Sequence, residues 1–273
     1  MVKKCLNGVS SYKNKIKRID RLLGNKNIAR ERIEYYRIVT NRIILGKKFI
    51  SILVDWSPCA NRKNYIIRAS LLLKNNSITI YEEVYIEKEH GTHKAHKRFL
   101  SNLKYVLPSD VEVLITTDAG FYADWFKLVL SNGWHFAGRL RGKFYYTSQI
   151  NIIWMRTRDL FEKATNKVKY LGKVIFTKKQ KLPCDMYLFK GKILGQSMNK
   201  PGRRGAHYRK SHKQPWLIVT SIPNNERSGN WIIAQYKFRM KIEHEFRRTK
   251  NPKWGVGLEY TKTSTPARLE VLL

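Results

Sequence analysis

The chain has 273 residues, with 54 Lys or Arg against 20 Asp or Glu, so its formal net charge is +34. Such a charge favours a polyanionic partner, for which nucleic acid is the natural candidate. With 42% hydrophobic residues it can also bury a sizeable core, which excludes a disordered basic tail. We see no apolar run of about 18 residues and no signal-peptide core, which excludes a membrane-spanning protein.

Residues 1–48 are rich in Lys, Arg and Asn, and their pattern predicts an amphipathic helix over 28–44. This stretch is interpreted as part of a helical DNA-binding region. Apolar periodicity then predicts elements in the order β-β-β-α-β-α-β: strands near 49–55, 65–73 and 78–86, a helix near 93–105, a strand ending at Asp118, a helix near 122–131 and a strand at 134–138. This order suits a ribonuclease-H-like mixed sheet with flanking helices, an α/β fold.

Short β-prone runs among basic and Gly-rich stretches follow from residue 139 to 214, which predicts a β-rich insertion domain. Within it, residues 200–213 form either a mobile loop whose cations lie along phosphates or plain disorder. A strand beginning at Trp216 then leads to a last helix over 236–250, which Pro252 ends.

The last helix carries the spacing Y-x2-R-x3-E-x6-K. At about 100° per residue, Tyr236, Arg239, Glu243 and Lys250 fall within a stripe of roughly 60°. Glu245 lies about 160° from Glu243 on this wheel and is expected to point away. Spacing alone fits a solvated charged face as well as a site.

Two further carboxylates make a site more plausible. Asp55 and Asp118 each close a β-rich apolar run, so each is expected at the C-terminal end of a buried strand. Ligands of α/β sheets collect at such ends, where two Asp and the helical Glu243 can hold a divalent metal. A strand-end cap or turn residue is the alternative for either Asp.

Together, Asp55-Trp-Ser, Thr117-Asp118-Ala-Gly-Phe and the helix motif resemble bacterial DDE transposases of the insertion-sequence-four type, especially the transposon-ten branch. The resemblance runs from about Phe49 to the end of the chain. It implies a ribonuclease-H-like core with a β-rich insertion before the last catalytic helix. It also implies cut-and-paste DNA transposition through a hairpin intermediate and strand transfer to target DNA.

By this resemblance Asp55, Asp118 and Glu243 are the catalytic residues and hold two Mg²⁺ per site, with Mn²⁺ able to substitute. Asp55 bridges the two ions, and the other acids each complete one side. The implied partners are double-stranded DNA, namely terminal inverted repeats and target, and a second copy in a homodimeric synaptic complex. The implied location is the bacterial cytoplasm, in association with the nucleoid.

The resemblance also assigns DNA contacts. Trp216 stacks on a base flipped from the transposon end, with simple packing between sheet and helix as the alternative. The remaining predicted contacts grip the DNA backbone: Tyr236, Arg239 and Lys250 beside Glu243, and Arg139, Arg141 and Lys143 on the insertion side.

Family members carry longer N- and C-terminal regions, so we expect a chain shortened at both ends. The expected domains are 1–48, a remnant of the DNA-binding region; 49–138, the first part of the core; 139–214, the insertion; and 215–273, the last strand and catalytic helix with a truncated C-terminus. Two alternatives stay open: a catalytically silent DNA-binding fragment that regulates transposition, and a nuclease of the same fold without strand transfer.

Two other groups of residues receive structural interpretations. Cys5, Cys59 and Cys184 share no C-x-x-C spacing, as expected in a reducing cytoplasm, and Cys59 is interpreted as a packed thiol. The His90, His93 and His96 cluster is interpreted as part of an exposed helix rather than a zinc site, because neighbouring Lys and Arg side chains oppose a cation.

Overall fold

The computed structural model describes residues 11–59, 63–74, 76–148, 153–191, 214–261, 263 and 265–273. The loop predicted over 200–213 and Cys5 lie outside these residues. The chain forms two compact units, one made of Met1–Val113 and Arg239–Leu273, the other of Leu114–Phe238. This division into two units does not test the four domains expected from the sequence, which stay a prediction.

The first unit contains an antiparallel meander in the order β3-β2-β1. Its strands are β1 (Phe49–Pro58), β2 (Asn64–Leu72) and β3 (Ser77–Ile86). Its helices are α2 (Tyr12–Leu23), α3 (Lys26–Ile44), α4 (His93–Val106), α8 (Met240–Lys250) and α9 (Pro266–Leu272), with short 3-10 turns η1 (Glu87–Glu89) and η4 (Leu258–Tyr260).

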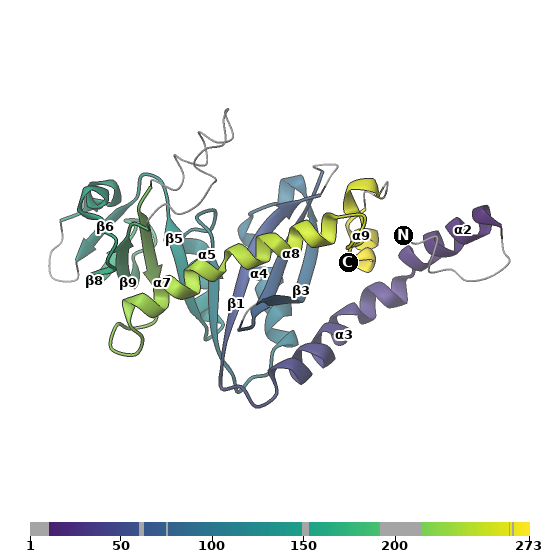
Figure 1. Cartoon of the computed structure of the whole chain (residues 1–273), viewed down its shortest axis with the longest axis horizontal. Helices are drawn as coiled ribbons and strands as arrows, with labels where there is room; N and C mark the ends of the chain where they lie inside the picture. Colours follow the sequence, from purple (N-terminus) through teal and green to yellow (C-terminus); the bar gives the residue numbers. More distant parts are fainter. Residues whose placement is uncertain are drawn as a thin grey trace. The chain divides into compact units, whose positions relative to one another are not determined.

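In the first unit, α8 lies over one face of the meander and α4 over the other (Figure 1). On the α8 face a core forms from Leu53, Ile66, Ile242 and Phe246, with Leu269 of α9. These residues come from segments far apart in sequence, so their burial fixes α8 and α9 against β1 and β2.

A buried ion pair crosses the same meander. The register places Asp55 opposite Arg68 and Arg68 opposite Glu82. Arg68 Nε donates to Glu82 Oε2 at 2.7 Å, and Nη1 donates to Thr249 Oγ1 of α8 at 3.0 Å. Because both charges are buried, their hydrogen bonds offset a desolvation cost of several kcal/mol per ion.

The second unit holds most of β4 (Glu112–Thr117) and a sheet in the order β4-β5-β10-β9-β8-β6-β7. The β4–β5 pair is parallel and the pairs from β5 to β7 are antiparallel, so the sheet is mixed. The other elements are α5 (Ala123–Ser131), β5 (His135–Leu140), β6 (Tyr145–Ser148), β7 (Met155–Arg156), η2 (Thr157–Lys163), β8 (Lys169–Phe176), β9 (Leu182–Phe189), β10 (Trp216–Thr220) and α7 (Gly229–Phe238).

Helices also pack on both faces of this second sheet. A Cβ at Gly138 of β5 would lie 2.3 Å from Phe126 of α5, so only glycine permits this close approach. On the other face, Tyr236 of α7 meets Trp216 of β10 edge to face, with ring centroids 5.1 Å apart. The side chain of Trp216 is thereby held against α7.

The α/β class with a mixed sheet and flanking helices is confirmed. From β1 to β5, the elements follow the β-β-β-α-β-α-β order expected of a ribonuclease-H-like core. No helix among the described residues has the length and apolarity needed to cross a membrane.

Three local predictions need correction. The predicted helix over 236–250 is two helices, because α7 ends at Phe238 and Ile242 N bonds to Arg239 O only three residues back, a tighter turn. Strand β1 continues to Pro58, so Asp55 lies inside the strand. Helix α2 was not predicted, although Ile16, Ile19 and Leu23 recur along it at helical spacing; none of its side chains is buried.

Candidate functional site

Asp55 and Glu243 meet at one cation. Arg239 Nη1 lies 3.4 Å from Asp55 Oδ2 and 2.8 Å from Glu243 Oε1. Strand β1 supplies the first acid and α8 the second, and all three residues belong to the first unit. Two of the predicted acids and one predicted cation are therefore brought together.

The neighbourhood of these acids is partly shielded from water. The side chains of Asp55 and Arg239 are 13% and 15% exposed, whereas that of Glu243 is 33% exposed. Asp55 Oδ1 also accepts from Trp56 N at 2.8 Å, which fixes the carboxylate on β1. Glu243 is the more accessible acid, and a second cation, Arg247, stands 3.9 Å from its Oε2.

Lys250 closes the same face of α8. Its Nζ donates to Ser57 Oγ at 2.8 Å, and Ser57 follows Asp55 by two residues on β1. Residues two apart on a strand share a face, so Glu243 and Lys250 both face the Asp55 side of β1. The predicted helical stripe holds within α8.

Glu245 points elsewhere, as the helical wheel predicted. It is buried, and its Oε2 accepts from Ser70 Oγ at 2.7 Å and Thr79 Oγ1 at 2.9 Å. Both donors belong to the meander. Glu245 thus secures α8 to the sheet and is not available for the chemistry assigned to Glu243.

Asp118 lies in the second unit, one residue past the end of β4. Its Oδ1 accepts from Gly120 N at 2.7 Å, an Asx turn. The half-buried side chain of Asp118 therefore acts as a turn residue, the alternative given for it in the sequence analysis. The turn also orients its carboxylate. Its catalytic role stays a prediction.

Trp216, Tyr236 and Arg139 form one cluster in the second unit. The Arg139 guanidinium lies 5.7 Å from the Trp216 ring centroid and donates to the carbonyls of Gln214 and Pro215. Arg139 is only 7% exposed and Tyr236 only 4%. Their burial fits positioning of Trp216 better than direct contact with phosphate.

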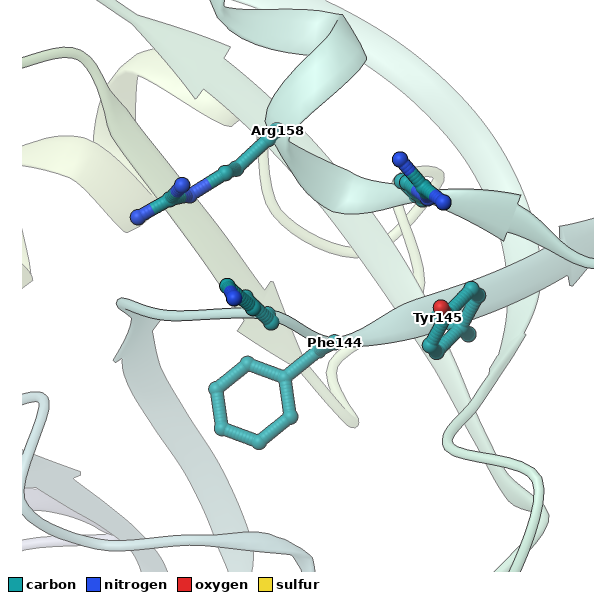
Figure 2. Close-up of a pocket in the computed structure, with 5 residues that line it drawn as sticks. Phe144, Tyr145 and Arg158 are labelled. Atoms are coloured by element: carbon teal, nitrogen blue, oxygen red, sulfur yellow. The ribbon is translucent and has the colours of Figure 1, made fainter.

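A basic cleft of about 260 Å³ lies at the start of β6. It is lined by Lys143, Phe144, Tyr145, Arg156 and Arg158, and Arg158 lies across it from Phe144 and Tyr145 (Figure 2). The three cations are exposed, and none is in an ion pair with another described residue. Lys143 was predicted as a DNA contact, but its two arginine neighbours were missed.

Arg141, the other predicted backbone contact on this side, is exposed on the turn that follows β5. Gly142, with φ of +110°, provides the left-handed backbone of this turn. The two cations that flank Gly142 are therefore presented on a tight turn.

The histidine cluster is exposed at His90 and at His93, the first residue of α4, as predicted, but His96 is buried, which corrects the prediction for that residue. His96 is buried in α4, and its Nε2 accepts from Trp56 Nε1 at 3.2 Å. Burial, and then the charges of His90 and His93, lower the pKa of His96 to about 4. The neutral ring thus supports the residue that follows Asp55.

Cys59 is a packed thiol, as predicted. It belongs to the core with Leu53 and Ile242. Desolvation raises its pKa to about 11, against the opposing charge of Lys250. A thiol with this pKa is protonated at neutral pH and is no nucleophile.

The donor set around Arg239 fits a divalent cation in part. A single cationic nitrogen contacts both acids, and carboxylate oxygens are the ligands that Mg²⁺ prefers. Among the described residues, no group of three His, Cys, Asp or Glu side chains is placed to hold a metal ion. The structure brings two acids together, Asp55 and Glu243. Asp118 as a third metal ligand is a proposal.

Comparison with known proteins places these residues in a family. The model of the transposase DDE domain matches residues 55–273, which is most of the chain and includes all three predicted acids. No match was found among curated proteins.

Among solved structures, the similar ones include two Argonautes, from A. aeolicus (11% identity, TM-score 0.35) and Marinitoga piezophila (12%, 0.32, with guide RNA). They cover 82% and 84% of this chain, which spans only 27% and 30% of theirs. At such scores they do not bear on function. The family model, by contrast, matches residues 55–273, more than half of the chain, so the chain belongs to the transposase DDE domain family.

Proposed function

We propose that the chain is a DNA transposase that cuts and joins DNA by divalent-metal-dependent hydrolysis and transesterification of phosphodiesters. The observation that carries the proposal is the convergence of Asp55 and Glu243 on Nη1 of Arg239. On a helix face that is only solvated, the glutamate is not expected to lie beside a carboxylate of β1, which is 188 residues earlier in the chain. Family membership supports the same chemistry.

Asp55, Asp118 and Glu243 are the proposed ligands of Mg²⁺, for which Mn²⁺ can substitute. Two such ions, when bound, activate water or a 3′-hydroxyl and neutralise charge on the reacting phosphate. The role proposed for all three carboxylates is to hold these ions.

The cations around the acids position the DNA. Arg239 holds both carboxylates before substrate arrives, and its guanidinium can turn to a phosphate once they bind metal. Lys250 lies within hydrogen-bond reach of Ser57 and presents a further charge on the same face. Both orient the scissile phosphate rather than exchange protons with it.

The finer course of the reaction rests on the resemblance to the transposon-ten branch. Each transposon end is nicked, the freed 3′-hydroxyl attacks the opposite strand to give a hairpin, water reopens it, and the end joins target DNA. In this proposal Trp216 stacks on a flipped base, with Arg139 and Tyr236 behind it. Arg141 and Lys143 bind the DNA backbone, and two copies synapse the paired inverted repeats.

The deciding experiment is a cleavage assay on DNA carrying the inverted repeats that flank the reading frame. With Mg²⁺ we expect nicks, hairpins and joined products, all lost in Glu243→Gln while DNA binding persists. Glu226→Gln, an exposed acid outside the site, is the matched control and keeps activity.

Other outcomes identify the alternatives. Binding without nicks under Mg²⁺ or Mn²⁺ would make the chain a silent DNA-binding regulator. Nicks without hairpins or joined products would make it a nuclease without strand transfer.

A further inference from the structure

An exposed tryptophan follows the helix that carries Glu243. Trp254 is 73% exposed, so burial in the protein core does not explain its presence. It lines a pocket of about 330 Å³ together with Arg247, Arg248 and Asn251. Among the residues that the structure describes, no acidic side chain lines this pocket, and the two arginines come from the last turn of α8.

The ring is carried by a rigid turn. Asn251 Oδ1 accepts from the backbone N–H groups of Lys253 at 2.7 Å and Trp254 at 3.3 Å. Gly255 N donates to Asn251 O at 2.9 Å, and a Cβ at Gly255 would lie only 2.0 Å from Arg248 O. The turn is therefore closed against the end of α8, which fixes the backbone that carries the exposed ring.

The surroundings of the ring are cationic. The Lys253 ammonium lies 5.0 Å from the Trp254 ring centroid. Arg247, whose side chain is 67% exposed, also contacts Glu243 at 3.9 Å. The pocket is thus joined through one residue to the proposed site, and its charge suits a phosphate-bearing ligand.

We infer that Trp254 is a stacking platform for one unpaired base of a DNA strand, with Arg247 and Arg248 binding its flanking phosphates. An aromatic ring accepts any base on its face, and arginines beside it bind the backbone. The base must be unpaired because neighbouring base pairs cover its faces within a duplex. The choice of DNA as the ligand rests on the proposed function, but binding of a base to Trp254 requires neither metal nor cleavage.

The test compares two single-stranded oligomers of equal length, one of thymidines and one of abasic sugar phosphates, by fluorescence anisotropy with the whole chain and no divalent metal. The wild type binds the base-bearing oligomer more tightly. Trp254→Ala reduces this preference about fivefold or more, Trp254→Leu does the same, and Trp254→Phe keeps most of it.

Two controls separate stacking from charge and folding. Tyr260→Ala, which removes a ring of 74% exposure in the same unit, leaves the preference unchanged. Joint replacement of Arg247 and Arg248 by Gln weakens binding of both oligomers equally. Circular dichroism verifies that each variant is folded.

An unchanged preference in Trp254→Ala, or an equal loss for both oligomers, would overturn the inference. If the proposed function is wrong but this inference is right, the protein does not cleave DNA and still binds the base-bearing oligomer more tightly.

Discussion

Glu243 and Glu245 are two residues apart on α8, and their carboxylates bind opposite kinds of partner. The first meets the guanidinium of Arg239, and the second accepts hydrogen bonds from the hydroxyls of Ser70 and Thr79. Replacement of Glu243 by its amide is therefore expected to affect catalysis, and replacement of Glu245 by its amide is expected to affect stability.

Glu245→Gln is expected to lower the free energy of unfolding by about 1–3 kcal/mol, because a buried, doubly hydrogen-bonded carboxylate is lost. Glu243→Gln is expected to change it by less than about 1 kcal/mol, since its ion pair is partly exposed. Urea unfolding gives both values. Equal destabilisation by the two substitutions would contradict the opposed placement.

Arg239→Gln is expected to increase affinity for Mn²⁺ by about 3–10-fold, because the guanidinium competes for the oxygens of Asp55 and Glu243. DNA cleavage is expected to fall nevertheless. Calorimetric titration with Mn²⁺ measures the first effect. Arg247→Gln is the control and changes the affinity less than twofold, because its contact with Glu243 is long.

The basic cleft of Lys143, Arg156 and Arg158 is expected to contribute to DNA affinity through phosphate contacts. Each exchange to Gln lowers the slope of log affinity against log salt by about 1. Binding measured over a salt series gives this slope. Lys88→Gln, which lies between Glu87 and Glu89, serves as the reference and leaves the slope unaltered.

His96 makes stability depend on pH. Its folded pKa of about 4 is below the ordinary value of 6.5, so between these values the unfolded chain binds the extra proton. Its contribution is complete above pH 6.5 and is lost as pH falls toward 4, by about 2 kcal/mol between pH 7.5 and 5. Protonation also removes the acceptor of Trp56 Nε1.

His96→Gln keeps an acceptor but does not titrate, so the fall in unfolding free energy from pH 7.5 to 5 should be smaller by that amount. Parallel pH curves for the two proteins would refute this assignment.

Arg68→Met is expected to lower the free energy of unfolding by about 3–5 kcal/mol, because it leaves the buried Glu82 without its cation. Arg68→Met combined with Glu82→Leu is expected to regain most of the loss. Thermal and urea unfolding of the three proteins measure this, and a double variant no more stable than the single one would contradict it.

Local patterns in the sequence account for much of this structure. Alternation and turn residues predicted the β1–β3 meander, and the 3.6-residue period predicted the separation of Glu243 from Glu245. Both properties depend on neighbours in the chain. Contact between Glu243 and Arg239 is also local, and the wheel placed both on one stripe.

Properties set by distant residues were not predictable. Nothing near Arg139 in sequence distinguishes it from the other 53 basic residues, yet its burial depends on Trp216, 77 positions later. The helix break at Arg239 and the extension of β1 to Pro58 likewise depend on packing partners elsewhere. Arg156 and Arg158 were missed because only the strand pairing of Tyr145 with Arg156 brings them to Lys143.

Burial sorts the charges of this protein unevenly. Among the described residues, four acids are buried, Glu82, Glu83, Asp185 and Glu245, but only two arginines, Arg68 and Arg139. The interior is therefore slightly anionic, and the solvent-facing shell carries a larger cation excess than the composition alone gives. A polyanion approaching from bulk water meets the surface cations first, and the buried acids lie farther from it, so they oppose its attraction less than exposed acids would.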